Sequence, residues 1–359
     1  MRNDFEKLKI SPMATLFQAM EQMDIVGHKL LMVYDVGEFV GLISIGAIQR
    51  ALIKGAAPKD VIKGHMSDDI VLCSLEDSEE TIKSEMLRCR AEYMPIVKKD
   101  KSSGRKYVVN IVFWDDLFVD GYSYKKDCEV YDLPVVIMAG GEGSRLRPLT
   151  NLVPKPLLPI SDKTIIEMII ERFAAIGCRR FFISLNYMAD VIEQYLISHN
   201  EGNYEFVFFR EDRPLGSGGS LSLIKERIKE TFFVTNCDNI LRQDLTEIVK
   251  AHRQNKNEMT VVAAVKGMTL SYGNLVVEAD ERVVKVEEKP ELLFRVNTGV
   301  YVMEPELLKE VPAERYFPMT DLMNIIIARN GRVGCFPITD GSWCDVGNWE
   351  DYMKLLGKR

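Results

Sequence analysis

The sequence lacks the features that direct a chain to a membrane, to nucleic acid or to an oxidising compartment. No apolar run approaches the roughly 18 to 20 residues of a membrane-spanning helix, and the N-terminal MRNDFEKLKI has no apolar signal-peptide core. A formal charge of -7 argues against general binding to nucleic-acid phosphates. The seven cysteines form no Cys-x-x-Cys or Cys/His ligand spacing, so reduced, mostly buried thiols are expected. We therefore expect a cytoplasmic protein that binds neither membranes nor nucleic acid.

Histidine and low-complexity sequence are also scarce. The four histidines lie outside every motif described below, and none is assigned a catalytic role. The composition is 47% hydrophobic and 28% charged, which is ordinary for a folded chain. Because 359 residues exceed the usual size of one domain, we expect two domains of unequal length.

Residues 1–125 contain a degenerate repeat. Residues 29–52 and 92–117 each have the pattern of a strand, a turn, a strand and a helix, and a helical pattern precedes each. This half resembles a pair of cystathionine-β-synthase (CBS) motifs, which bind adenosine nucleotides in many proteins. The resemblance implies a ribose-binding aspartate at the start of a unit's last helix, which is Asp116 in the second unit, whereas Ala47 stands there in the first. The pair either binds a regulatory nucleotide or serves packing and oligomerisation, and we expect a homo-oligomer.

From Leu133 onward, apolar strands alternate with longer helices. Candidate strands cover residues 134–140, 179–186, 204–210, 230–238 and 259–265, and candidate helices cover 164–177 and 188–200. This alternation predicts an α/β fold with a Rossmann-like, mostly parallel mixed sheet, preceded by the small α/β pair. Ligands of such sheets bind beyond the carboxyl ends of the strands.

The segment VVIMAGGEGSRLRPLTNLVPKP, residues 135–156, is a buried strand followed by a glycine-rich turn. Glycines at 140, 141 and 143 let backbone N–H groups approach an anion. The dinucleotide fingerprint fails because Leu146 occupies its third glycine position, and no Gly-Lys-Ser/Thr follows to make a P-loop. Two cations follow instead, Arg145 and Lys155, and the prolines that flank Lys155 stiffen its backbone. A glycine turn beside two fixed cations suits a triphosphate.

The same segment resembles the signature of sugar-1-phosphate nucleotidylyltransferases, G-G-x-G-x-R-L-x-P-L-T followed by P-K-P. Every fixed position of that signature is met, and the resemblance covers residues 134–359. In RPLGSGGSL, Ser217 and Gly218 replace the more usual Thr and Ala, which leaves the base contacts open. The resemblance implies nucleotide contacts by Ala139, Gly140, Gly141, Gly143, Ser144, Glu211, Gly216 and Gly219.

The resemblance also implies a metal site and a sugar site. Mg²⁺ would be held by Asp238, at the end of the strand FFVTNCDN, and by Asp345 in WCDVGNW. This ion takes one or two carboxylates together with phosphate oxygens and water. VVKVEEKPE resembles an E-K-P element, in which Glu288 would accept sugar hydroxyls and Lys289 would hold the sugar phosphate. Gly273 and Asn297 would line the hexose pocket, with Tyr272 and Thr298 as weaker assignments.

The reaction implied is attack by a sugar-1-phosphate oxygen on the α-phosphorus of a nucleoside triphosphate, which expels pyrophosphate. The implied catalytic residues are Arg145, Lys155, Asp238 and Lys289. A CBS pair before a short transferase resembles the bacterial guanylyltransferases of surface-sugar pathways, including those that activate glucosamine-1-phosphate for legionaminic acid. GTP and a hexose-1-phosphate, such as glucosamine-1-phosphate or mannose-1-phosphate, are therefore the favoured substrates. A catalytically silent regulatory relative and a CBS-based nucleotide sensor remain alternatives.

Overall fold

The computed structural model describes residues 5–66, 72–89, 91–100, 105–113, 130–313 and 315–357. The chain divides into two compact units. The first comprises residues 1–126, 265–294 and 339–341, and the second comprises residues 127–264, 295–338 and 342–359. None of the helices in the described ranges is both long and apolar enough to cross a membrane.

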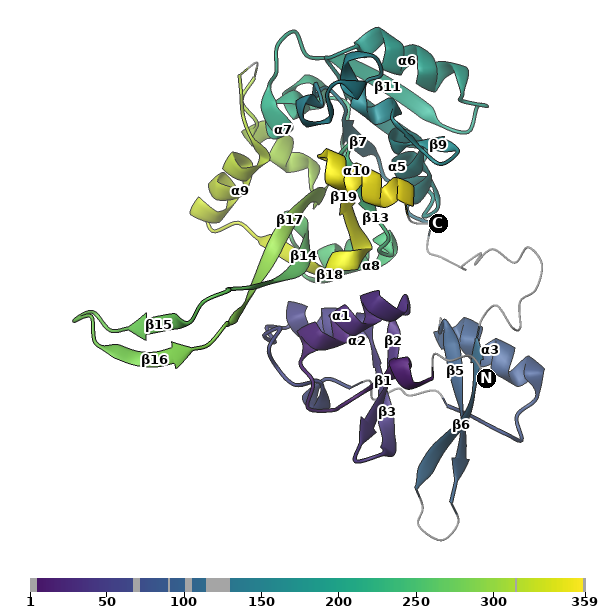
Figure 1. Cartoon of the computed structure of the whole chain (residues 1–359). Coiled ribbons are helices and arrows are strands. Elements are labelled where there is room, and N and C mark those ends of the chain that lie inside the picture. The colour runs from purple at the N-terminus through teal and green to yellow at the C-terminus, as the bar shows by residue number, and fades with distance from the viewer. Residues whose placement is uncertain are drawn as a thin grey trace. The chain divides into compact units, whose positions relative to one another are not determined.

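The first unit contains two repeats of one small α/β fold (Figure 1). The first repeat consists of β1 (Lys9–Ile10), α1 (Leu16–Val26), β2 (Leu30–Asp35), β3 (Glu38–Ser44) and α2 (Ile45–Ile53). The second consists of β4 (Cys73–Ser74), α3 (Glu79–Cys89), β5 (Tyr93–Lys99) and β6 (Lys106–Phe113). In both sheets a parallel pair is followed by an antiparallel pair. The predicted repeat of strand, turn and strand is confirmed, whereas the helix predicted after β6 lies outside the described residues.

Local sequence explains the elements of the first repeat. Thr15 begins α1 with a capping box that it forms with Gln18, and Gly27 ends the helix at a φ of 74°. Ser44 caps α2, and its hydroxyl accepts a hydrogen bond from the backbone N–H of Ala47. Ala47 therefore lies in the first turn of α2, at the helix start where the sequence predicted it.

Polar contacts join the two repeats of the first unit. The Tyr93 hydroxyl donates to the backbone carbonyl of Leu30 over 2.8 Å. The backbone N–H of Lys29 donates to the carboxylate of Glu92 over 2.9 Å. Tyr93 is fully buried, so its hydroxyl needs such a partner. The repeats thus share one structure rather than standing apart.

A seven-stranded sheet forms the centre of the second unit, and its strand order is β11-β10-β7-β12-β17-β14-β18. Strands β11, β10, β7 and β12 are mutually parallel, and β17 is antiparallel to β12. The strands are β7 (Val135–Met138), β10 (Arg180–Leu185), β11 (Glu205–Arg210), β12 (Phe232–Asn236), β14 (Met259–Thr269), β17 (Glu291–Met303) and β18 (Val333–Thr339). This mixed, mostly parallel sheet confirms the predicted fold class.

Helices and short ribbons surround this sheet. The helices are α5 (Ile165–Ala174), α6 (Ala189–Ser198), α7 (Gly216–Gly219), α8 (Leu245–Gln254), α9 (Met319–Ala328) and α10 (Trp349–Gly357). The ribbons pair β8 (Pro159–Ile160) with β9 (Lys163–Thr164), and β13 (Asn239–Leu241) with β19 (Trp343–Asp345). Thr164 begins α5 with a capping box that includes Glu167. The buried face of α5 is apolar, as the sequence periodicity predicts.

The register of the central strands decides where the ligand edge lies. Met138 at the end of β7 pairs with Ser184 of β10 and with Asn236 of β12. The residues that follow these three strands therefore leave the sheet at one level, which is its carboxyl edge. These residues are the glycine turn after β7, the segment after β10 and Cys237–Asp238 after β12.

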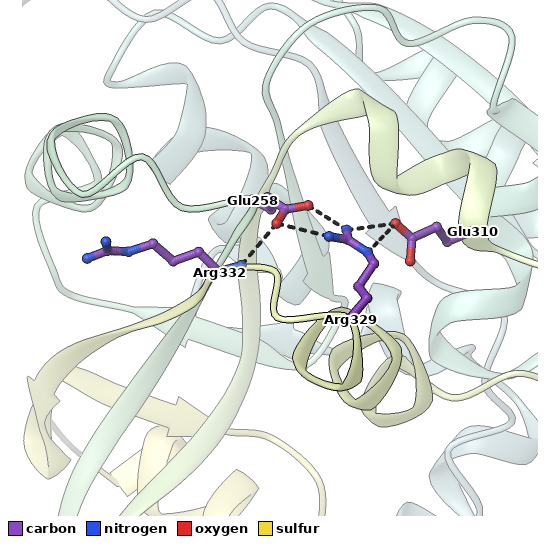
Figure 2. A network of polar contacts seen from close by, with 4 residues as sticks. All are labelled: Glu258, Glu310, Arg329 and Arg332. Carbon is purple, nitrogen blue, oxygen red and sulfur yellow. Dashed lines mark hydrogen bonds and ion pairs between the residues drawn. The ribbon is translucent and has the colours of Figure 1, made fainter.

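An arginine-centred network fixes the first residues of β14 (Figure 2). Arg329, directly after α9, donates to both carboxylate oxygens of Glu258 and to Glu310. Glu258 also accepts from the backbone N–H of Arg332 over 2.9 Å. The bond from Arg329 lowers the pKa of Glu258. The Arg332 side chain extends away from this cluster, and none of its four residues lines the pocket described below, so we assign the network a structural role.

Strands β14 and β17 lead into a two-stranded hairpin of β15 (Asn274–Val277) and β16 (Val283–Glu287) (Figure 1). The hairpin belongs to residues 265–294, which group with the first unit. Lys289, in the turn after β16, has a φ of 44°, a left-handed conformation that residues other than glycine rarely adopt. Strained backbone of this kind occurs most often at functional positions.

Candidate active site

A pocket of about 350 Å³ opens at the carboxyl edge of the sheet in the second unit. It is formed by the turn after β7, the segment around α7 and the residues that follow β12. Predicted nucleotide, catalytic and metal residues share this pocket, namely Gly140, Gly141, Gly143, Ser144, Arg145, Lys155, Glu211, Gly216 and Asp238. The structure therefore brings together groups that stand far apart in the sequence.

The glycine turn is shaped by close packing behind it. Gly143 has a φ of 61°, and a Cβ added there would lie 3.0 Å from Lys155 Cβ and 3.0 Å from Thr150 Cγ2. Only glycine fits this combination of conformation and space. The buried Thr150 hydroxyl donates to the Gly143 carbonyl over 2.9 Å, which fixes the turn from within. Arg145 follows the turn, is exposed, and lines the pocket.

Lys155 and Asp238 form an ion pair in the pocket. The Lys155 Nζ to Asp238 Oδ2 distance is 2.5 Å, and the two side chains are 8% and 20% exposed. Lys155 is held in place by the short 3-10 helix Lys155–Leu157, whose residues are buried. A cation and an anion thus neutralise each other where phosphates are expected to bind.

Asp345 joins this pair from a distant part of the chain. It pairs with Asn239 across the β13–β19 ribbon, and the backbone N–H of Val346 donates to the Asp238 carbonyl over 2.9 Å. Burial, and next the nearby Asp238 carboxylate, raise the pKa of Asp345. Its Oδ1 atom is buried and has no hydrogen-bond partner in the part of the chain that the structure describes. An unpaired, buried carboxylate oxygen needs a cation or a proton.

These two carboxylates fit a divalent cation. No cluster of three or more His, Cys, Asp or Glu side chains that could hold a metal occurs within the described ranges. Mg²⁺ nevertheless needs only one or two protein carboxylates when substrate phosphates and water complete its shell. The unpaired Asp345 oxygen and the adjacent Asp238 carboxylate are therefore the donors that this ion requires.

Glu211 also lines the pocket, beside the glycine turn. Its Oε1 accepts a hydrogen bond from the buried Ser184 hydroxyl over 2.5 Å, and its Oε2 accepts from the backbone N–H of Leu215 over 2.9 Å. A carboxylate has about four lone-pair positions, so capacity for ligand donors remains. Gly140 lies directly beside it, since an added Cβ would come within 3.3 Å of Glu211 Oε1.

Other predicted residues lie outside the lining of this pocket. Ala139 is buried beneath the turn, and Gly219 packs against the Arg315 carbonyl. Asn297 donates to the Tyr301 hydroxyl over 2.8 Å and accepts from the Gly299 N–H. Gly273, Glu288 and Lys289 belong to the hairpin segment 265–294, where an added Gly273 Cβ would lie 3.1 Å from Glu288. Their sugar-binding role stays a prediction, and Asp116 lies outside the described residues.

Several lining residues were not predicted as ligand contacts. These are Met138, Pro214, Ser220, Asn236, Cys237 and Gly347. Asn236 and Cys237 directly precede Asp238 at the end of β12, so their position along a parallel strand could have indicated them. Burial raises the pKa of the Cys237 thiol to about 12, which makes it an inert wall rather than a nucleophile.

Comparison with known proteins assigns this geometry to a family. The sequence profile named Nucleotidyl transferase matches residues 134–358, which is more than half of the chain. The chain belongs to the nucleotidyl transferase family. Its matched segment contains all the residues that line the pocket.

Relatives of the nucleotidyl transferase domain include enzymes that act on sugar phosphates. The chain is 27% identical over 242 residues to UTP--glucose-1-phosphate uridylyltransferase of Synechocystis sp., and the match covers 62% of each chain. It is 28% identical over 228 residues to the mannose-1-phosphate guanylyltransferase catalytic subunit beta of Danio rerio, covering 62% of this chain and 63% of that protein. The chain thus spans about three-fifths of the length of these curated relatives.

A solved structure resembles the same domain. The crystal structure of HddC from Yersinia pseudotuberculosis matches with a TM-score of 0.50 and 27% identity. The match covers 63% of this chain and 99% of that one. The similarity therefore extends over almost the whole solved chain, and more than a third of this protein lies outside the matched region.

Proposed function

We propose that this protein transfers a nucleoside monophosphate from a nucleoside triphosphate to a hexose-1-phosphate, giving a nucleotide sugar and pyrophosphate. The observation that carries the proposal is one pocket that combines a glycine turn, two cations and the Asp238 carboxylate, with Asp345 held next to Asp238 by the β13–β19 ribbon. Such a site can gather two polyanionic substrates and neutralise the charge that develops between them. The sugar-phosphate enzymes among the relatives support the same reaction class.

The nucleophile in this reaction is already an anion, so a protein base is not required. The glycine turn would receive the triphosphate through backbone N–H groups. Arg145 would stabilise the leaving pyrophosphate. The Lys155 ammonium group would move from Asp238 to the α-phosphate. Lys289 of the hairpin would hold the phosphate of the incoming sugar, and Glu288 its hydroxyls.

Magnesium fits the Asp238 and Asp345 carboxylates for the reasons given above. When bound there, the ion would supply charge neutralisation at phosphate oxygens. The protein's own part is to keep Asp345 next to Asp238, which the β13–β19 ribbon does through backbone pairing. Lys155 keeps Asp238 neutralised when phosphates are absent.

Guanine is the nucleobase that the pocket supports best. Guanine presents two neighbouring N–H donors, N1–H and the N2 amino group, and the Glu211 carboxylate is an acceptor-only group in the pocket wall. Two lone-pair positions of the Glu211 carboxylate accept from the Ser184 hydroxyl and the Leu215 backbone N–H, which hold Glu211 in place. We propose GTP as the donor and a hexose-1-phosphate of the glucosamine or mannose type as the acceptor.

We propose further that residues 134–359 form the catalytic domain and that residues 1–125 form a CBS pair with a regulatory or oligomerising role, in a cytoplasmic homo-oligomer. The repeated sheets of the first unit support a pair of related units. Ala47 at the start of α2 offers no ribose-binding carboxylate, so a nucleotide of the usual kind would require the second repeat.

The test is pyrophosphate release from purified full-length protein with Mg²⁺. Four nucleoside triphosphates are combined with glucosamine-1-phosphate, mannose-1-phosphate and glucose-1-phosphate, and the products are identified by mass. We expect turnover with GTP and one of the amino or mannose sugars. A protein that binds triphosphate but forms no nucleotide sugar with any combination would instead be a silent regulatory relative.

A further inference from the structure

The carboxyl end of β10 supports both walls of the pocket without lining it. On one side, the Ser184 hydroxyl donates to the Glu211 carboxylate, and the Asn186 side-chain amide donates to the Glu211 carbonyl over 2.6 Å. On the other side, Tyr187 contacts the segment that contains the glycine turn. Residues 184–187 carry no part of the nucleotidylyltransferase signature, and their importance follows only from these contacts.

Tyr187 contacts that segment at two places. Its backbone N–H donates to the Gly140 carbonyl over 3.4 Å, and its hydroxyl donates to the Thr150 carbonyl over 3.0 Å. Thr150 in turn donates to the Gly143 carbonyl over 2.9 Å. Three hydrogen bonds thus join Gly140 to Tyr187, Tyr187 to Thr150 and Thr150 to Gly143, and the backbone from Gly140 to Gly143 closes them into a ring around the turn. Tyr187 enters this ring from the segment that follows β10.

We propose that Tyr187 is a positioning residue that holds the glycine turn in its triphosphate-binding conformation. The proposal rests on the proposed function, because it assigns the turn to the triphosphate. A turn with three glycines has many conformations when unrestrained, and ordering them on binding would weaken affinity. The ring orders the backbone beforehand. Tyr187 itself contacts no reacting atom, so its effect passes through Thr150 and Gly140.

The Tyr187→Phe variant tests this, because it removes the hydroxyl that bonds to Thr150 and keeps the aromatic side chain. Calorimetry with GTP and Mg²⁺ on the full chain, or with whichever triphosphate the wild type binds most tightly, gives the affinity. We expect about three- to tenfold weaker binding, the range that one neutral hydrogen bond carries. The Michaelis constant for the triphosphate should rise in parallel, whereas that for the sugar phosphate should stay within about twofold, since the removed bond supports only the triphosphate wall.

Tyr352→Phe is the matched control. The Tyr352 hydroxyl donates to the Pro159 carbonyl over 2.8 Å, so this variant loses the same type of bond in α10, at a residue that belongs neither to the ring nor to the pocket lining. Its melting temperature should fall about as much as that of Tyr187→Phe, with triphosphate affinity unchanged. Thr150→Val removes the second bond of the ring at constant volume. Both bonds order the same turn. The fold loss of triphosphate affinity in the variant that carries both substitutions should therefore be smaller than the product of the two single fold losses.

Each outcome decides the proposal. Wild-type triphosphate affinity in Tyr187→Phe would overturn it, as would fully multiplicative losses in the double variant. Equal losses for triphosphate and sugar phosphate would also overturn it and indicate a general structural role. A wild-type protein that binds no triphosphate would overturn the proposed function first, and this inference with it.

Discussion

Replacing Lys155 with methionine separates its structural role from its catalytic one. The change keeps an unbranched side chain that is one atom shorter, but it leaves the Asp238 carboxylate without its 2.5 Å partner, close to the Asp345 carboxylate. Removing one partner of a buried ion pair costs about 3 to 5 kcal/mol. Because Asp238 is 20% exposed toward the pocket, we expect the lower end, about 3 kcal/mol. For a unit of this size, the melting temperature should fall by roughly 6 to 12 °C in EDTA.

Divalent cations should reverse much of this loss. With Lys155 gone, the two carboxylates have no competing ammonium group, so Mn²⁺ or Mg²⁺ should bind the variant more tightly than the wild type. Tenfold tighter binding would return about 1.4 kcal/mol at saturating metal. Turnover should nevertheless fall by roughly two to three orders of magnitude, because a cation that stabilises the transferred phosphate is lost. In this variant, metal should thus restore stability without restoring turnover.

The assay is thermal unfolding in EDTA and across a Mn²⁺ titration, beside pyrophosphate release. Lys163→Met is the matched control, because Lys163 pairs with Glu171 over 2.7 Å on the surface, where the two side chains are 42% and 49% exposed. Exposed pairs of this kind contribute about 0 to 1 kcal/mol, and no metal response is expected. If Lys155→Met keeps wild-type stability in EDTA and gains nothing from Mn²⁺, the ion pair does not neutralise Asp238 and the reasoning is wrong.

Three further predictions test other parts of the second unit. Asp345→Asn should abolish most turnover and Mn²⁺ binding while raising the free energy of unfolding by roughly 0.5 to 1 kcal/mol. The reason is that the substitution removes a buried carboxylate whose pKa is raised by burial. A variant that is less stable than the wild type in EDTA would argue that this carboxylate is paired. Burial lowers the pKa of His252, so His252 contributes stability that is present above its ordinary pKa of 6.5 and is lost as the pH falls below it. Denaturant melts from pH 7.5 to 5.5 should show this loss in the wild type and a flatter profile in His252→Gln, and a wild type that becomes more stable toward pH 5.5 would reverse the sign. Gly143→Ala should cost roughly 1 to 2 kcal/mol and weaken triphosphate binding, because the new Cβ would press on Lys155 and Thr150 at 3.0 Å; unchanged binding by calorimetry would show that the turn tolerates a side chain.

Local pattern in the sequence determined the fold class and one wall of the site. Continuous apolar runs separated by amphipathic helices predict a buried parallel sheet, because burial on both faces leaves no place for polar residues. The glycine turn could be predicted with Arg145 and Lys155, since glycine content, prolines and charge act within a few residues of one another. The repeat in the first unit was predictable for the same reason, because strand and turn residues recur in order.

Only the tertiary structure decided which distant residues complete the site. Asp345 meets Asp238 because β19 pairs with β13, and a register between short strands so far apart in the chain has no local signal. The ring through Tyr187 depends on the alignment of β10 with β7, which packing determines. The unpaired Asp345 oxygen likewise exists only once neighbouring atoms have excluded water. Sequence periodicity records which side chains are buried, whereas the partners of a buried polar group depend on how whole elements pack.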